Sequence, residues 1–462
     1  MRRRFPRFLR ATLRRASQVA VLVVPTVLAL AVTQDARAGG WDTPMLYSAR
    51  HMGMGGTAVS YVRDPSAMFH NPAGLAHTRR LSLLGDFSLL LGTIQGSPDR
   101  APPSIESNTT VAPFFLVGAA FRPLSFLTAG IAVYPVASAG ATYEYRREGS
   151  DTLIEDTTRI LFVEISPGIA LQLPMYPQLS IGFGWRVTLV SLDRDRAPAD
   201  GSSEDLLLAL SGSNLAGFRV GLQWQPIPQL EVGIAYRHKT VTELDSETGR
   251  ALMGIEIMNP RTELTLPSRL VLGVRGNLGP VSAAADVEIG FNSQNDRAPI
   301  TVDLGPDMPL DIPNVFEWST ALTLRLGVEY RIGLGGVVLD PDRTPSRAIT
   351  AVPGEATDAT ATTGRRVVVT PRLGFVYDAR TSNPGYPSAF GTPPAPTLVF
   401  TGGVGLDLGG FEANLAFAHR FGSVTISDQD VAESDPCPFC GRPGDYEIGL
   451  SGIYVDVGYD FE

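Results

Sequence analysis

Much of the chain alternates between apolar and polar residues with a period of two. In Leu179–Leu189, Leu, Ile, Phe, Trp and Val occupy one set of positions, and Ser, Gly, Arg and Thr occupy the other. The same alternation recurs in Leu230–Arg237, Trp318–Ile332 and Ile453–Phe461. Because successive side chains of a β-strand point to opposite faces, this period predicts strands with one apolar and one polar face. Segments of about 9 to 11 residues have the length of a tilted strand that crosses a membrane.

Short and long connections between these segments alternate along the chain. Short ones, such as 122–125, 174–177 and 277–279, alternate with longer and mostly polar ones. Short turns at one rim and long loops at the other are typical of outer-membrane barrels, whereas strands of soluble sandwiches average only about 5 to 6 residues. The pattern predicts an all-β fold, a transmembrane antiparallel β-barrel of about fourteen strands with both barrel ends on the periplasmic side. We expect strands at 81–93, 112–121, 126–136, 160–173, 178–193, 214–225, 229–239, 264–276, 280–292, 316–332, 366–379, 395–408, 410–423 and 447–461.

One connection departs from this alternation. Residues 333–365 should form a short periplasmic turn, yet the segment is long and rich in Ala, Thr and Pro. Either it is a disordered insertion, which its linker-like composition favours, or a strand has been missed there. We therefore assign 81–462 to the barrel, with 333–365 as a periplasmic insertion.

The first 38 residues have the order of a secretory signal peptide. Residues 1–18 carry seven arginines and no acidic residue, and residues 19–32 are apolar. Ala36-Arg37-Ala38 then supplies the small residues of a cleavage site. The apolar run of about 14 residues is too short for a membrane-spanning helix, and no later run approaches 18. We expect export to the bacterial outer membrane.

Charge and cysteine content narrow the partners. The formal net charge is -9, and loss of residues 1–38 would remove eight arginines and one aspartate, which makes the mature chain more acidic still. Nucleic acid is therefore not expected as a partner. Two cysteines, Cys437 and Cys440, are too few for a disulfide scaffold.

Residues 41–80 do not alternate and precede the first predicted strand. They contain the glycine-rich stretch Gly53–Gly56, an Asp64-Pro65-Ser66 turn and then Asn71-Pro72-Ala73. Side chains can fill a barrel of eight strands, but one of fourteen is wide enough to need a plug. In this setting the segment resembles the N-terminal hatch of the FadL-like family, outer-membrane transporters of long-chain fatty acids and aromatic hydrocarbons.

The resemblance extends over the chain as the strand count, the strand end Tyr236-Arg237 and the terminal strand that closes on Phe461. Family proteins usually end on the aromatic residue itself, whereas Glu462 follows here. The resemblance implies a monomer without cofactor or metal. Its partners would be a hydrophobic small molecule, a fatty acid or a hydrocarbon, and the lipid of the outer membrane.

The family's mechanism, as the resemblance implies it, is passive. A hydrophobic ligand docks between extracellular loops and moves to a pocket inside the barrel. Residues 39–80, the hatch with its motif Asn71-Pro72-Ala73, then shift, and the ligand leaves sideways beside an irregular third strand. Gly130 and Pro135 mark this lateral exit, because Gly weakens a strand and Pro cannot donate to the ladder.

Two predicted extracellular loops, the third and the fourth, hold apolar residues where polar ones are expected. In the family these two loops form the docking groove. Large exposed apolar patches usually mark binding sites, although these residues could also simply pack on each other. The predicted groove consists of Leu206, Leu207, Leu208, Leu210, Leu252, Met253, Ile255, Ile257 and Met258.

Other candidate chemistry is weaker. Cys437 and Cys440 lack the second pair that zinc needs, so a local disulfide or a simple loop feature is favoured. Plug histidines are interpreted as hydrogen-bonded residues rather than as a metal site. Lumen-facing arginines could meet a ligand carboxylate, but most are expected to pair with Glu231, Asp286, Glu329 or the plug. The histidines are His51, His70 and His77, and the arginines are Arg186, Arg219, Arg275, Arg325 and Arg372.

The sequence offers no sign of an enzyme, because it has neither a Gly-x-Ser-x-Gly motif nor a recognisable serine–histidine spacing. The predicted function is a channel for passive uptake of long-chain fatty acids or other hydrophobic compounds. The alternative is a barrel that transports nothing and serves as a scaffold or secretion-system partner. A ligand-binding groove would distinguish the two.

Overall fold

The computed structural model describes residues 47–98, 104–146, 151–199, 206–251, 255–305, 308–334, 367–391, 393–431 and 440–461. The chain divides into two units, 1–36 and 37–462. The first unit lies outside the described residues, and so does the predicted signal peptide at 1–38.

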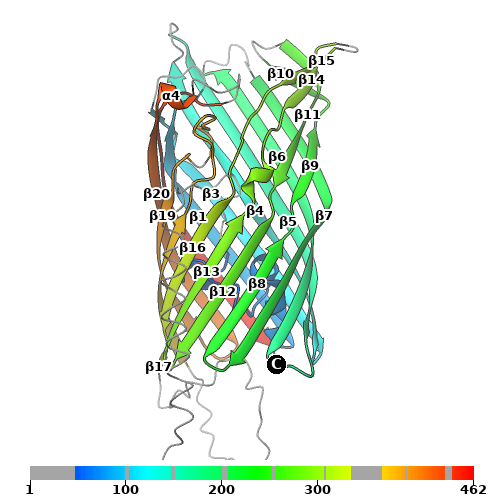
Figure 1. Cartoon of the computed structure of the whole chain (residues 1–462), viewed down its shortest axis with the longest axis vertical. Helices are drawn as coiled ribbons and strands as arrows, with labels where there is room; N and C mark the ends of the chain where they lie inside the picture. Colours follow the sequence, from blue (N-terminus) through cyan, green and yellow to red (C-terminus); the bar gives the residue numbers. More distant parts are fainter. Residues whose placement is uncertain are drawn as a thin grey trace, which may run out of the picture. The chain divides into compact units, whose positions relative to one another are not determined.

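Strands dominate the second unit (Figure 1). They are β1 (Leu81–Gly96), β2 (Ile105–Glu106), β3 (Thr110–Leu124), β4 (Leu127–Arg146), β5 (Leu153–Gln172), β6 (Leu179–Pro198), β7 (Leu206–Ile227), β8 (Leu230–Arg237), β9 (Thr240–Asp245), β10 (Thr248–Ala251), β11 (Ile255–Leu266), β12 (Arg269–Leu278), β13 (Val281–Gly290), β14 (Ile300–Asp303), β15 (Pro309–Ile312), β16 (Ala321–Tyr330), β17 (Ile332–Leu334), β18 (Val367–Asp378), β19 (Thr397–Asp407), β20 (Phe411–Ile426) and β21 (Gly444–Phe461). The described helices are α2 (Ala49–Met52), α3 (Ala67–His70), α4 (Asp428–Val431) and the 3-10 helices η1 (Pro72–His77) and η2 (Asn292–Gln294). None of them is long and apolar enough to cross a membrane.

Antiparallel pairing joins the strands into a closed barrel of 14 wall strands. The order around the wall is β1, β3, β4, β5, β6, β7, β8, β12, β13, β16, β18, β19, β20 and β21. The last strand pairs with the first from Leu81↔Phe461 to Gln95↔Glu447. Because β9 continues β8, β11 leads into β12 and β17 continues β16, these short strands add no wall position. The fold predicted from the alternation is therefore confirmed.

The two faces of the wall differ as a membrane barrel requires. Large apolar side chains such as Phe87, Ile181 and Phe417 are exposed on the outer face, where alternate residues of each strand point. Charged residues such as Arg186 and Glu164 are fully buried on the inner face. An apolar outer band around a polar interior is the arrangement of outer-membrane barrels. The protein is a multi-pass barrel of the bacterial outer membrane.

The wall rises higher than the alternation predicted. At the rim with the longer connections, β4 runs to Arg146, β6 runs to Pro198, and β7 begins at Leu206. The prediction that Leu206–Leu210 and residues 255–258 lie in loops is therefore wrong. Leu206–Leu210 pair with β6, and residues 255–258 pair with β10. The reason is that the period of two continues through them, with Leu206, Leu208 and Leu210 pointing inward.

At the opposite rim, most wall strands are joined by short turns, for example between β3 and β4 and between β12 and β13. The exception is the connection to β18, most of which (335–366) lies outside the described residues. Since β16 pairs directly with β18, this connection places no wall strand between them. Its assignment as an insertion stays a prediction.

Candidate functional site

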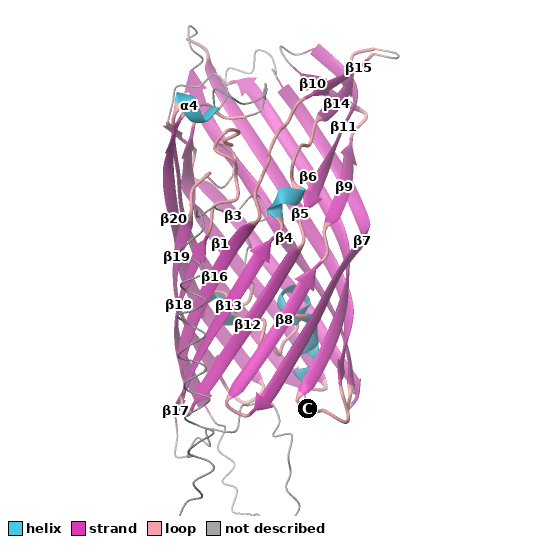
Figure 2. Cartoon of the chain, viewed as in Figure 1, coloured by secondary structure: helices cyan, strands magenta, loops and turns pink. Residues whose placement is uncertain are grey.

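Residues 47–78 touch wall strands on all sides of the lumen. Gly55 donates a backbone hydrogen bond to Thr401 Oγ1 of β19, Ala58 donates to Asp286 of β13, and the Met68 carbonyl accepts from Tyr134 of β4. Such contacts with opposite walls require the segment to lie inside the barrel, where Figure 2 shows its helices in the lower part. The largest apolar core lies at its boundary with the wall and includes Tyr47 and Leu75. We call residues 47–78 the lumen segment.

Asn71 joins the lumen segment to β7. Its side-chain nitrogen donates to the carbonyls of Val59 (2.7 Å) and Leu222 (3.1 Å), and its oxygen accepts from the amide of Ala73 (3.1 Å). The last bond caps η1, which begins at Pro72. The wall approaches so closely that a Cβ at Gly221 would lie 1.8 Å from Asn71 Oδ1. Asn71-Pro72-Ala73 is thus a buried joint between segment and wall, and its role as a hatch motif stays a prediction.

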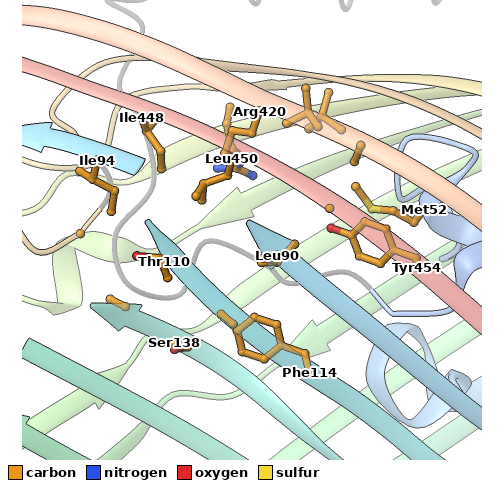
Figure 3. Close-up of a pocket in the computed structure, with 18 of the residues that line it drawn as sticks. Met52, Leu90, Ile94, Thr110, Phe114, Ser138, Arg420, Ile448, Leu450 and Tyr454 are labelled. Atoms are coloured by element: carbon orange, nitrogen blue, oxygen red, sulfur yellow. Dashed lines mark ion pairs between the residues drawn. The ribbon is translucent and has the colours of Figure 1, made fainter. Parts of the chain in front are cut away.

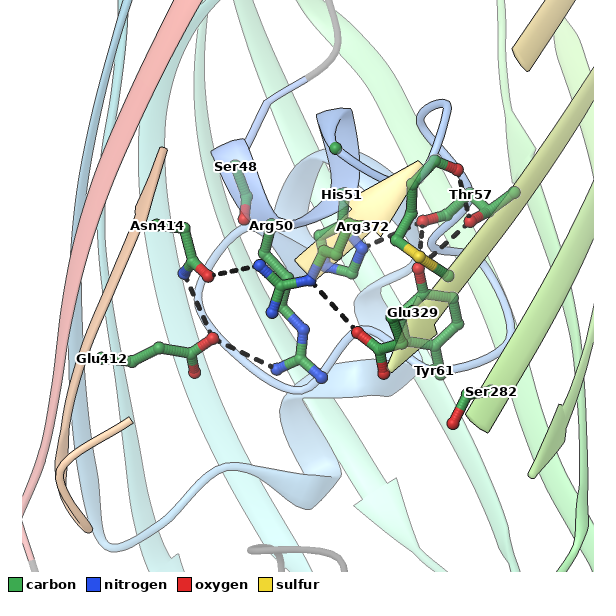
Figure 4. Close-up of polar contacts among 12 residues, drawn as sticks. Ser48, Arg50, His51, Thr57, Tyr61, Ser282, Glu329, Arg372, Glu412 and Asn414 are labelled. Carbon is green, nitrogen blue, oxygen red and sulfur yellow. Dashed lines mark hydrogen bonds and ion pairs between the residues drawn. The ribbon is translucent and has the colours of Figure 1, made fainter. Parts of the chain in front are cut away.

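A chain of ion pairs and hydrogen bonds runs along one side of the lower lumen, and Figure 4 shows its part from Glu329 through Arg372 to Asn414. It starts at Arg63 of the lumen segment, crosses the inner faces of β8, β12, β16, β18, β20 and β21, and returns to Ser48 and the Arg50 amide of the segment. The links are Arg63–Glu231, Glu231–Arg275, Arg275–Glu329, Glu329–Arg372, Arg372–Asn414, Asn414–Asp456 and Asp456 with Ser48 Oγ and the Arg50 amide. We call this set the polar ring. Because buried charges are tolerated only when paired, the ring holds segment and wall together.

The lumen arginines predicted from the sequence all have acidic partners. Arg275 and Arg372 pair with Glu329 as expected. The sequence did not single out Glu164, which pairs with Arg186 and Arg219, or Glu288, which pairs with Arg325. Which acidic residue meets which arginine depends on the register between neighbouring strands, and the alternation within one strand does not reveal that register.

Two histidines of the lumen segment bond within it, and the third, His77, lies 3.1 Å from Ser180 Oγ of β6. The His51 Nδ1 lies 3.0 Å from the Thr57 carbonyl, and the His70 Nε2 lies 2.8 Å from the Tyr47 carbonyl. Burial lowers the pKa of His70 and of His77 to about 3, so both are neutral at pH 7. Among the described residues, no group of three or more His, Cys, Asp or Glu could hold a metal ion.

Above the lumen segment the lumen holds two mostly apolar cavities. One cavity of about 150 Å³ lies between Met52 of the segment and the inner faces of β1, β3, β18, β19, β20 and β21, and Figure 3 shows Phe114, Leu90 and Tyr454 around it. Arg420 and Asp378, 3.1 Å apart, form its polar end. We call it the inner cavity. Its apolar walls are Met52, Leu90, Ile94, Ala112, Phe114, Val376, Val399, Ile448, Leu450 and Tyr454.

A second cavity of about 110 Å³ adjoins the first. Phe316, Trp318, Leu192 and Ile300 line it, and we call it the outer cavity. Ala139 and Gly391 line both cavities, so the two meet at these residues.

The wall is unpaired beside the inner cavity. The ladder between β3 and β4 ends at Val117↔Val133, although β3 continues to pair with β1 and β4 with β5. The β4–β5 register shifts between Pro135 and Ala137. Above the gap, the amide of Asn108 donates to the Thr142 carbonyl (2.8 Å) and ties the two sides together again. We call residues 110–116 and 134–141 the lateral gap.

Gly130 and Pro135, predicted to mark the exit, lie on either side of the point where the β3–β4 ladder ends. Gly130 still pairs with Ala120, and Pro135 stands just above Val133, where pairing with β3 has ended. The Pro135 carbonyl accepts a hydrogen bond from the Tyr47 hydroxyl (2.5 Å) of the lumen segment. The sequence did not single out Tyr47, since nothing local marks a tyrosine whose partner lies 88 positions away. The exit role stays a prediction.

The predicted groove residues are packed rather than open. Leu206 and Leu208 form a buried cluster with Ile257 and with residues of the β14–β15 hairpin, and Leu210 joins the main core. Met258 is exposed, and Leu207 is half-buried. Leu252 and Met253 lie outside the described residues, as does the side chain of Ile255. This packing favours the interpretation that these residues pack on each other, and their role as a docking groove stays a prediction.

The cysteine pair was predicted to form a local disulfide or a simple loop feature. Cys440 is disulfide-bonded, and its sulfur lies 3.6 Å from the Val315 carbonyl. Cys437 lies outside the described residues.

Solved structures of similar fold include a FadL homologue and toluene transporters. A Pseudomonas aeruginosa FadL homologue aligns over 92% of this chain and 100% of its own, with a TM-score of 0.63 and 14% identity. The Pseudomonas putida toluene transporter TodX aligns over 90% of this chain and 99% of its own, with a TM-score of 0.62 and 14% identity. The chain has the fold of the FadL-like channels.

A third structure of this fold, the Ralstonia pickettii toluene transporter TbuX, has 15% identity and a TM-score of 0.58, and aligns over 91% of this chain and 100% of its own. No protein-family model matches the chain, and no curated protein matches its sequence. The structural similarity establishes the FadL-like fold, but identities this low do not identify the ligand.

Proposed function

We propose that the protein is a passive channel that admits small hydrophobic compounds through the outer membrane. The observation that carries this proposal is the meeting of the inner cavity with the lateral gap. Residues from both sides of the gap also line the cavity: Thr110, Ala112 and Phe114 from β3, and Ser138, Ala139 and Gly140 from β4. A ligand in the cavity therefore lies against the part of the wall where no ladder hydrogen bond has to break for it to leave.

The proposed route runs from the outer cavity to the inner cavity and then sideways above Gly130 and Pro135. The outer cavity begins beside the cluster of Leu206, Leu208 and Ile257, because Ile300 belongs to both. Straight passage is disfavoured, since an apolar ligand would have to separate the polar ring from its partners. The lumen segment, with Asn71-Pro72-Ala73 as its joint, would act as the hatch that controls the inner cavity.

The cavity dimensions suggest the ligand class. An apolar cavity of about 150 Å³ is large enough for benzene. A longer alkyl chain would have to extend through both cavities, gaining about 0.8 kcal/mol for each buried CH₂. A toluene-sized ligand fits the inner cavity alone. We therefore propose single-ring hydrocarbons and short alkyl compounds as the best substrates, with long-chain fatty acids as a second class.

Uptake by cells that carry no other such channel tests the proposal. Cells that produce the protein should take up radiolabelled toluene faster than cells with an empty vector. Ala139→Trp should abolish the gain, because the indole would occupy the junction of the two cavities and the edge of the gap. Ala129→Trp is the matched control, since Ala129 lies on the same strand with its side chain exposed on the outer face.

Heat-modifiable gel migration would verify that each barrel is folded. Equal uptake by the wild type and the empty-vector cells would contradict the channel and favour a scaffold. Full uptake by Ala139→Trp would contradict the route.

A further inference from the structure

We propose that Phe390, carried by the connection between β18 and β19, is a size-selective gate between the outer and inner cavities. The proposal rests on the channel function above and adds to it a residue that discriminates among ligands. The connection is residues 379–396, of which all but residue 392 are described.

The connection crosses the lumen. On one side of the barrel, β16, β13, β12, β8 and β7 separate β18 from β6, and on the other, β20, β21, β1 and β3 separate β19 from β4. Yet the Ala389 carbonyl accepts a hydrogen bond from Tyr143 of β4 (2.5 Å), and the guanidinium carbon of Arg194 of β6 lies 4.4 Å from the Phe390 ring centre. A chain that starts at β18 and reaches these residues has to span the interior.

The connection is fixed at several points along its course. Thr381 accepts a backbone hydrogen bond from Ser319, and the Pro387 carbonyl accepts one from Gly441 (2.6 Å). Tyr143, which holds its tip, is fully buried. The position of Phe390 is therefore set by the fold.

Two contacts hold the Phe390 ring in place. Arg194 stacks above its face, and Tyr143 meets it edge-on, with ring centres 5.4 Å apart and planes at 85°. Arg194 is itself held by an ion pair with Asp156. Cation–π and edge-to-face contacts are individually weak, so the ring prefers this position but is able to leave it.

Phe390 stands where the cavities meet. Its side chain lines the outer cavity, and the next residue, Gly391, lines both. An added Cβ at Gly391 would meet nothing within 4 Å, so that this position borders open space. Ala139 of β4 lines both cavities as well. A ligand that moves from the outer to the inner cavity has to pass between these residues, so the ring limits the width that passes.

Two variants change the width in opposite directions. Phe390→Ala removes the ring and widens the passage. Gly391→Leu narrows it, and the open space around this position allows the side chain without disturbing the packing. Phe417→Ala is the control, because Phe417 is a phenylalanine of similar size on the outer face of β20.

The measurement is the initial rate at which cells take up radiolabelled toluene, with one ring, and phenanthrene, with three fused rings. Phe390→Ala should raise the phenanthrene rate relative to the toluene rate by roughly three- to tenfold, as expected if the ring no longer has to give up its contacts with Arg194 and Tyr143. Gly391→Leu should lower that ratio, and Phe417→Ala should leave it unchanged.

The outcomes separate the gate from the channel. If the wild type takes up toluene but neither variant changes the ratio, the gate is refuted and the channel stands. If the wild type takes up neither compound faster than empty-vector cells, the channel is refuted and the gate with it. Should Phe390→Ala fail to fold in the gel assay, the response of the ratio to Gly391→Leu decides.

Discussion

Asn71 shows how one residue joins the lumen segment to the wall. A buried amide is costly unless its donors and acceptor are satisfied, and here the side chain bonds within the segment and to β7 at once. The joint also requires the wall to have no side chain at the contact. Gly221 and Gly182 meet this need, since a Cβ at Gly182 would lie 2.2 Å from the Ala73 amide nitrogen. Asn71-Pro72-Ala73 can therefore dock only because the wall has glycines at these two positions.

His70 predicts that the lumen segment is held less firmly in acid. Burial lowers its pKa from 6.5 to about 3, so the docked segment binds this proton less readily than the undocked chain. Docking is at full strength above pH 6.5 and weakens as the pH falls toward 3, by about 2 kcal/mol at pH 5. Hydrogen exchange of residues 67–75, corrected for intrinsic rates, should show this loss of protection between pH 7 and pH 5. His70→Gln, which keeps a donor for the Tyr47 carbonyl, should reduce it.

Neighbouring groups make the comparison with His70→Gln necessary. The His51 ring centre lies 5.1 Å from that of His70, and burial lowers its pKa as well, so His51 acts in the same direction. Burial raises the pKa of Asp64 to about 6, which stabilises docking in acid and acts in the opposite direction. The charges of Arg325 and Arg219 lower the pKa of His70 further. The same loss of protection in wild type and variant would show that His70 is not the responsible group.

At the scale of elements, the wall strands were predictable because their signal is local. Alternation in Leu179–Leu189 reports which residues face lipid without any knowledge of the neighbouring strands. The upper ends were missed where charged residues interrupt the apolar face, as Asp193 and Asp195 do on β6. They stay in the ladder because they pair with β5 and β7 on both sides.

The features around the cavities were not predictable in the same way. The connection 379–396 has the composition of an ordinary surface loop, and its course across the lumen depends on Tyr143 and Arg194 of distant strands. The lateral gap was anticipated only through Gly130 and Pro135. The length of the gap depends on where β3 stops pairing with β4, and this is set by the geometry of the closed wall.

Tyr47 links two elements, the lumen segment and β4. Its hydroxyl satisfies the Pro135 carbonyl at the base of the lateral gap, and leaving such a carbonyl unpaired costs about 1 to 3 kcal/mol. Tyr47→Phe should therefore loosen the unpaired part of β4 and speed hydrogen exchange of residues 134–141. Tyr61→Phe is a matched control, because that buried hydroxyl bonds to Thr57 within the segment. Equal exchange at 134–141 in both variants would contradict the link.

The whole molecule has the polar ring in the lower part of its lumen and two mostly apolar cavities in the upper part. Below, the lumen segment packs on the wall through the largest apolar core and through the paired charges of the polar ring. Above, the two cavities lie among apolar side chains and touch the lateral gap. An apolar ligand gains by burial in the upper part and would lose by entering the lower one. In the proposed channel this contrast would direct the ligand toward the wall, and the filled lower part would close the direct path to ions.

Glu329 is the place to test this division, because it pairs with both Arg275 and Arg372 at the centre of the polar ring. Glu329→Gln removes the charge that compensates two buried arginines, and breaking a buried pair costs about 3 to 5 kcal/mol. The segment should then undock part of the time while the outer face of the barrel is unchanged. Single-channel recording in planar bilayers should show a low conductance for the wild type and frequent larger openings for the variant. Glu243→Gln is the control, since Glu243 is exposed on β9, and it should behave as the wild type does. If Glu329→Gln remained closed to ions while folded, the ring would not be what keeps the lower lumen shut.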